Sequence, residues 1–234
     1  MKYVLSPEEE AGFEVTWCAV PVKADRSFSM KSTSSCRLVA AYPGRNTFLY
    51  FESLFEFSCA QYFWARQDVI DLRTQQVVTY EDEFGTQEHY FDLVVTFSNG
   101  EVVLFACRPE GRDKSGDLAA TLENIRNQTL RFHGDRCEML TDHDITEADV
   151  YRAREILRSR MFRNRSNCKQ LLDLSEKIGK PVQVFKLLEA FGDEGAGWNA
   201  MWNLIGEGRI EHLAPDANST LTHLSWIKVK GYDA

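Results

Sequence analysis

The chain has 234 residues, of which 44% are hydrophobic and 26% are charged, and its formal net charge is −8. This length suits one large domain or two small ones, and the sequence contains no apolar run of about 18 residues that would predict a membrane span. The first ten residues are polar and lack the basic start and apolar centre of a secretory signal. We therefore expect a cytoplasmic protein of ordinary globular composition that makes no membrane contact.

Cysteine and histidine are too scattered to predict a metal site. The six cysteines include no C-x-x-C pair, and the five histidines show no spacing typical of zinc ligands. We expect buried or free thiols in a reducing compartment and no dedicated zinc site.

The first clear pattern begins at residue 51, after segments at 13–23 and 35–42 that look like strands or irregular structure. From there apolar residues recur at i, i+3, i+4, i+7 and i+8, which predicts an amphipathic helix of about four turns over 51–63. Glu52 and Glu56 would lie four residues apart, along one margin of its apolar stripe.

Three strands are expected next, at 77–80, 89–97 and 102–107. The Asn99-Gly100 pair lies between the last two, which predicts a hairpin with a two-residue turn and positive φ at both turn residues. On strand 89–97 one face would carry only apolar side chains, those of Phe91, Leu93, Val95 and Phe97.

Asp92 would lie on the opposite, less hydrophobic face of that strand, with Tyr90, Val94 and Thr96. An aspartate in so apolar a strand is unfavourable unless a partner compensates its charge. The partner could be a divalent cation or an arginine, and the sequence leaves both open.

The remaining elements divide into two groups at a boundary near 141–146. A helix at 117–130 and a strand at 136–140 complete an α/β unit with helices packed on a mixed sheet. A capping-box variant, Thr146 with Asp149, opens a helix that runs to about residue 160. Helices at 166–177, 181–191 and 196–206, followed by two short strands, predict a winged helix. We expect domains at 1–144 and 145–234.

A concentrated basic stretch distinguishes the second domain. Residues 151–169 contain seven Lys and Arg against one acid, and residues 145–234 have a net charge of +1 against −9 for residues 1–144. Arginines surround a narrow apolar stripe on this helix, and forked guanidinium groups bind phosphates well. A solvated helix face is the competing interpretation. The candidate DNA contacts are Arg152, Arg154, Arg158, Arg160, Arg163 and Arg165.

Several short segments resemble TnsA-like transposon endonucleases, whose N-terminal domain belongs to the PD-(D/E)XK nuclease superfamily. The matching segments are FESLFE at 51–56, Gln75-Gln76, YFDLVV at 90–95 and VLFACRP at 103–109. The segment WNLIGEGRI at 202–210 resembles the helical, winged-helix C-terminal domain of that family. Together the resemblances cover about residues 50–230.

The resemblance implies a metal-dependent nuclease site with two altered positions. Glu56 matches the helical glutamate in an S-x-x-E context, and Asp92 matches the aspartate entering the hairpin. The third acid falls on Ala106 and the lysine on Arg108. Such nucleases hold Mg²⁺ with carboxylates near the scissile phosphate, so Glu56 and Asp92 are the expected metal ligands, and Arg108 keeps only positive charge.

Three functions follow from the resemblance. The first is a TnsA-like DNA-binding protein with weakened or lost cleavage, in which Asp92 and Arg108 form a structural ion pair. The second is an active Mg²⁺-dependent endonuclease with a relocated ligand, for which Glu52, Glu101 and Glu110 are candidates. The third is a protein-interaction module without a DNA role. Because the family acts with a transposase, a protein partner is also implied.

Overall fold

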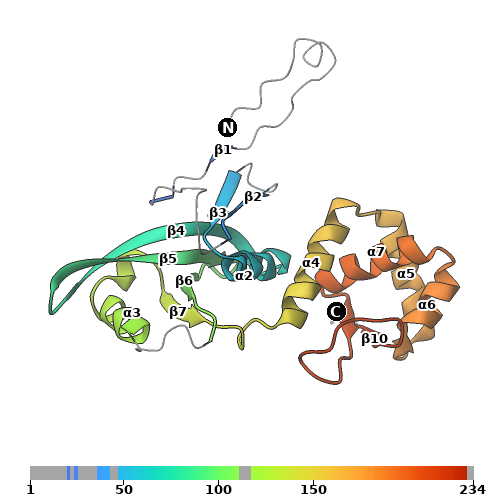
Figure 1. Cartoon of the computed structure of the whole chain (residues 1–234). Coiled ribbons are helices and arrows are strands. Elements are labelled where there is room, and N and C mark those ends of the chain that lie inside the picture. Colours follow the sequence, from blue (N-terminus) through green and yellow to red (C-terminus); the bar gives the residue numbers. More distant parts are fainter. Residues whose placement is uncertain (1–19, 22–23, 26–35, 43–46, 111–116, 231–234) are drawn as a thin grey trace, which may run out of the picture.

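The computed structural model describes residues 20–21, 24–25, 36–42, 47–110 and 117–230 (Figure 1). The first group of elements comprises β1 (Val20–Pro21), β2 (Leu38–Tyr42), β3 (Thr47–Phe51), α2 (Leu54–Ala65), β4 (Val69–Asp82), β5 (Gly85–Phe97), β6 (Val102–Cys107), α3 (Asp117–Gln128), a 3₁₀ turn η2 (Leu130–Phe132) and β7 (Arg136–Leu140).

A four-stranded sheet in the order β4-β5-β6-β7 forms the centre of this first part. Its neighbours are antiparallel except β6 and β7, which run parallel, so the sheet is mixed. Leu93 and Phe105 pack in the cluster that contains Phe63 of α2, while Leu104 packs in the cluster that contains the buried residues of α3. The predicted mixed sheet flanked by helices is therefore confirmed.

Helix α2 begins later than the sequence pattern predicted. Ser53 is its N-cap and its hydroxyl accepts a hydrogen bond from the Glu56 backbone N–H at 3.1 Å. Phe51, predicted as the first helical residue, instead ends β3 and pairs with Leu38 of β2. The Ser53 cap, which follows a short apolar strand, sets the start of α2. The helical periodicity alone did not reveal this start.

The predicted strands at 77–80 and 89–97 are parts of two longer strands, β4 and β5, which pair from Val69 to Asp82. They form a long hairpin that extends away from the helices of the second part (Figure 1). The second predicted hairpin, between β5 and β6, is confirmed. Its turn differs from the expected type, because Gly100 has a φ of 90° and Asn99 does not have positive φ.

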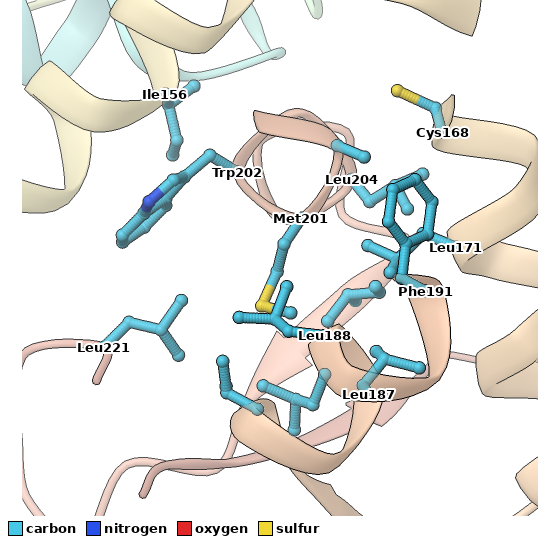
Figure 2. Packing of buried hydrophobic residues seen from close by; sticks show 14 of the residues in the cluster. Ile156, Cys168, Leu171, Leu187, Leu188, Phe191, Met201, Trp202, Leu204 and Leu221 are labelled. Atoms are coloured by element: carbon cyan, nitrogen blue, oxygen red, sulfur yellow. The ribbon is translucent and has the colours of Figure 1, made fainter. Parts of the chain in front are cut away.

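The second part comprises α4 (Glu147–Met161), α5 (Arg165–Ile178), β8 (Val182–Gln183), α6 (Val184–Phe191), α7 (Glu194–Gly206), β9 (Ile210–His212) and β10 (Trp226–Val229). Its strands form a small antiparallel sheet in the order β8-β10-β9. Helices α5, α6 and α7 enclose a core that includes Leu171, Leu188 and Met201 (Figure 2).

Of two predictions about the second part, one is confirmed and the other is wrong in its bounds. The Thr146 capping box is confirmed, since its hydroxyl accepts from the Asp149 N–H and the Asp149 carboxylate accepts from the Thr146 N–H. The helix predicted over 181–191 was too long: Val182 pairs with Ile227 of β10, so a short strand precedes α6. In the described part of the chain, no helix combines the length and apolar character needed to cross a membrane.

Candidate functional site

Glu56 is fixed at the start of α2 by its own helix cap. One carboxylate oxygen accepts a hydrogen bond from the Ser53 hydroxyl at 2.9 Å, and the other accepts from the Glu52 backbone N–H at 2.8 Å. The side chain is buried. The S-x-x-E segment is therefore a working N-terminal cap, which gives this motif a structural role independent of any metal.

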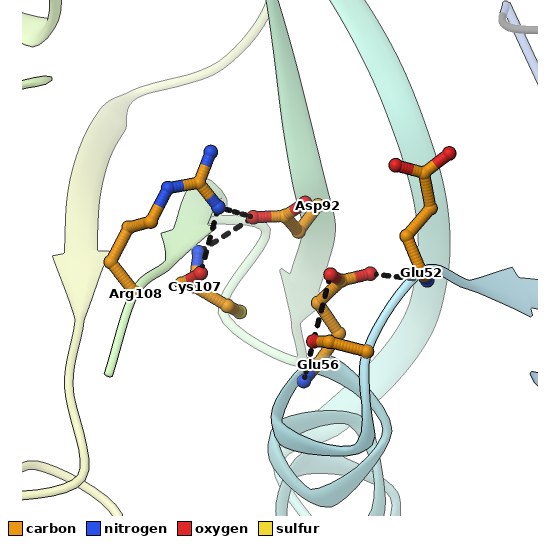
Figure 3. A network of polar contacts seen from close by, with 6 residues as sticks. Glu52, Glu56, Asp92, Cys107 and Arg108 are labelled. Carbon is orange, nitrogen blue, oxygen red and sulfur yellow. Dashed lines mark hydrogen bonds and ion pairs between the residues drawn. The ribbon is translucent and has the colours of Figure 1, made fainter. Parts of the chain in front are cut away.

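Asp92 lies buried in β5 and has an arginine as its charged partner (Figure 3). Its Oδ2 atom accepts from the Cys107 backbone N–H at 2.7 Å and lies 3.4 Å from Nη1 of Arg108. Arg108 also donates to the Cys107 carbonyl at 2.9 Å. Of the two partners expected for Asp92, the structure thus supplies the arginine.

Burial and mutual repulsion make the two carboxyl groups weak acids. Burial is the largest cause that raises the pKa of Asp92 to about 7, and the charge of Glu56 raises it further. Burial also raises the pKa of Glu56, with a contribution from Glu52. The nearby Arg108 lowers both, but it is partly exposed to solvent and does not offset the burial.

The strand opposite Asp92 is irregular. Gln75 has a φ of 55°, and it lies between Thr74, which pairs with Leu93, and Gln76, which pairs with Phe91. Phe91 packs with the α3 cluster and not with Leu93, so the predicted all-apolar face of this strand was wrong at that residue. A left-handed residue in the neighbouring strand breaks the regular geometry on which that prediction depended.

Two polar groups near this irregularity were missed by the sequence reasoning. The side-chain amide of Gln75 is buried, and its nitrogen has no hydrogen-bond partner among the residues that the structure describes. The same holds for Nε2 of His89, whose pKa is lowered to about 4 by burial and by the charge of Arg108. Gln75 lies in the Gln75-Gln76 segment of the resemblance but was given no role of its own, and His89 carried no motif.

The positions considered for a third metal ligand are mostly occupied by other contacts. Ala106 is fully buried in the α3 cluster and offers no ligand atom. Glu101 pairs with Arg136 at 2.6 Å. Glu110 contacts His143 at 2.5 Å.

Glu52 is the remaining candidate, and its charge acts on both Glu56 and Asp92. Within the described ranges, however, no three His, Cys, Asp or Glu side chains are grouped closely enough to hold a metal ion. The guanidinium of Arg108 already places positive charge against Asp92. The residues present therefore do not fit a Mg²⁺ clamp of the kind that the resemblance implied.

Two of the predicted DNA-contacting arginines join the first part to the second. Arg160 donates to the carbonyls of Trp64 at 2.8 Å and Ala65 at 2.5 Å, at the C-terminal end of α2. Arg154 donates to the side-chain oxygen of Gln61 at 3.0 Å. Both guanidinium groups are thus engaged in packing α4 against α2.

Two others are held within the second part. Arg152 pairs with Asp149 at 3.1 Å, one turn earlier on α4. Arg163 pairs with Glu207, which follows α7, at 2.6 Å. These contacts reduce, without abolishing, the positive charge that the helix presents to a phosphate.

Arg158 and Arg165 are the most available of the six. The Arg158 side chain is 76% exposed, and its contact with Glu155 is long, at 3.7 Å. Arg165 is exposed at the first residue of α5 and pairs with no acid among the described residues. Met161 and Phe162, which lie between them, are also exposed.

The C-terminal half of helix α7 packs against α4. The ring of Tyr151 packs edge-on against Trp202, with 6.1 Å between centroids. A Cβ atom on Gly206 would lie only 2.6 Å from Cγ2 of Ile156, so the two helices approach closely there. The stripe of α7 that contains Trp202 belongs to the core, as predicted.

Comparison with known proteins adds no relative. No protein-family model matches the chain, and a search of curated proteins found no match.

Proposed function

We propose that this chain is a TnsA-like DNA-binding protein whose PD-(D/E)XK-type domain has lost most or all metal-dependent cleavage. The observation that carries the proposal is the contact between Arg108 and Asp92 at 3.4 Å, beside the buried carboxyl of Glu56. A fixed guanidinium there supplies the positive charge that a metal ion would otherwise supply. With Ala106 in the third position, the ligand set is also incomplete.

The topology of the second part supports a winged-helix interpretation. Helix α5, strand β8, helices α6 and α7, and then β9 and β10 follow one another along the chain, and the strands pair in the order β8-β10-β9. This is a three-helix unit followed by a hairpin wing. Because α4 packs against the C-terminal half of α7, we infer that α7 does not enter the major groove in the usual way of such a helix.

Arg158 and Arg165 are therefore our choice for the DNA-contacting residues. Both are exposed, and they flank the turn between α4 and α5. Arginine at such sites binds phosphate oxygens without reading the base sequence. We infer a mainly electrostatic mode of binding to the DNA backbone.

An active endonuclease is the second candidate, because the charges of Glu52 and Glu56 both raise the pKa of Asp92. Buried acids that repel one another release that repulsion when a cation binds. We rank this function second, since Arg108 already offsets part of the negative charge at Asp92.

The binding half of the proposal is tested with a fluorescent DNA duplex titrated at several salt concentrations. We expect affinity to fall steeply with salt, and the double variant Arg158→Gln/Arg165→Gln to reduce the slope of log affinity against log salt by about 2. The matched control is Arg73→Gln/Arg131→Gln, which removes the same charge from the first part. Binding without salt dependence, or equal slopes for both double variants, would reject this placement of the DNA surface.

A further inference from the structure

A second concave surface lies in the second part, away from Asp92 and Arg108. It is a groove of about 550 Å³ between α4, α7 and the segment that precedes β10. Five of its twelve lining residues carry rings, and the rings come from all three of these segments. They are Tyr151, Phe162, Trp198, Trp202 and His223.

The rings are held in a defined arrangement. Trp198 and Trp202 are stacked with 6.5 Å between their centroids, and His223 packs edge-on against Trp198 at 5.2 Å. Trp202 points from α7 toward the edge of the hydrophobic core, near Ile156 (Figure 2). The rings of Trp198 and Trp202 are thus fixed by packing, whereas the side chain of Phe162, at the edge of the groove, is 70% exposed.

Among the described residues that line the groove, Arg158 is the cation available to a ligand. Glu194 beside the groove is hydrogen-bonded to Nε2 of His223 at 2.7 Å. Glu155 is contacted by Arg158 at 3.7 Å, a distance too long for a tight pair. The Arg158 guanidinium lines the groove while remaining open to solvent, so it can bind an anionic group that lies over the rings.

We propose that this groove binds unpaired nucleobases of single-stranded DNA, with the exposed rings of Tyr151 and Phe162, beside the half-buried Trp198, as stacking surfaces and Arg158 on a phosphate. Aromatic faces beside an arginine are the combination that single-strand-binding surfaces use, because every base has a face on which it can stack. The inference deepens the proposed DNA-binding function and rests on it. It also gives the second part a means of contacting DNA although the C-terminal half of α7 packs against α4.

The test uses the intact chain and a thymidine oligonucleotide of about 10 nucleotides. Because Trp198 and Trp202 line the groove, stacking should quench tryptophan fluorescence as the oligonucleotide is added. We expect Phe162→Ala to weaken this binding at least about fivefold, the lower limit for loss of one stacked base. The matched control is Phe84→Ala, which removes an exposed phenylalanine from the tip of the β4–β5 hairpin and should leave binding unchanged.

Duplex binding by the same variants separates this inference from the proposed function. Duplex binding without quenching by the oligonucleotide would overturn the inference and leave the proposed function standing. Equal oligonucleotide affinities for Phe162→Ala and Phe84→Ala would overturn it as well, and would favour a protein side chain as the occupant of the groove. If the wild-type protein bound neither the duplex nor the oligonucleotide, both the inference and the proposed function would be overturned.

Discussion

Between pH 5 and pH 8, the wild-type protein should lose about 2 to 3 kcal/mol more of its free energy of unfolding than Asp92→Asn. The reason is the pKa of Asp92, which is raised to about 7 by burial and by the charge of Glu56. A carboxyl with a raised folded-state pKa stabilises the fold fully only below its unfolded pKa of about 4, and that stability is lost as the pH rises through about 7. The asparagine side chain cannot ionise, yet it can still accept the Cys107 N–H bond.

Denaturant unfolding at pH 5, 6, 7 and 8 measures this difference. Asp68→Asn is the matched control, because its pairing with Arg66 lowers the pKa of Asp68, so that this group stays ionised in both states throughout the range. The free energy of unfolding of Asp68→Asn should therefore change with pH as that of the wild type does. Equal pH slopes for the wild type and Asp92→Asn would contradict the buried, repelling pair of carboxyl groups.

Arg160→Gln should destabilise the protein by about 2 kcal/mol, since it removes two charged hydrogen bonds to the end of α2. These bonds satisfy the carbonyls of Trp64 and Ala65, which have no helical N–H partner so close to the C-terminus of α2. Thermal unfolding measures the loss, and limited proteolysis at 141–146 reports whether α4 has separated from α2.

Arg158→Gln, on the same helix, is the control for that variant. Its side chain is largely exposed and its only charged partner among the described residues is the distant Glu155, so we expect a change within about 0.5 kcal/mol. Equal losses for the two variants would show that Arg160 does not join the two parts. The contrast matters for DNA-binding studies, because a loss of affinity in Arg160 variants would also reflect altered folding.

The elements with strong local signals were well predicted. The Thr146 capping box, the helix near 54–65 and the strand at 89–97 each depend on neighbours within a few positions, and each is present, although the alternation of the strand fails at Phe91. The sequence also suggested an arginine as partner for Asp92, and Arg108 lies there. Such features are encoded locally, by period, cap and turn chemistry.

The features that were missed depend on contacts between distant segments. The sequence could not show that Arg160 would bind carbonyls about 95 residues away, because nothing in the basic stretch distinguishes it from Arg158. The left-handed conformation of Gln75 was equally hidden, since glutamine is not a residue that predicts positive φ. The hairpin tip between β4 and β5 is polar apart from Phe84, so the strands appeared shorter than they are.

Cleavage of supercoiled plasmid most directly tests the claim that Arg108 has replaced the metal ion beside Asp92. The purified protein is incubated with Mg²⁺ and then with Mn²⁺, alongside Asp92→Ala, over a range of protein concentrations. We predict no metal-dependent nicking above the level of Asp92→Ala. Nicking by the wild type that requires the metal and disappears in Asp92→Ala would contradict the account and identify a working nuclease.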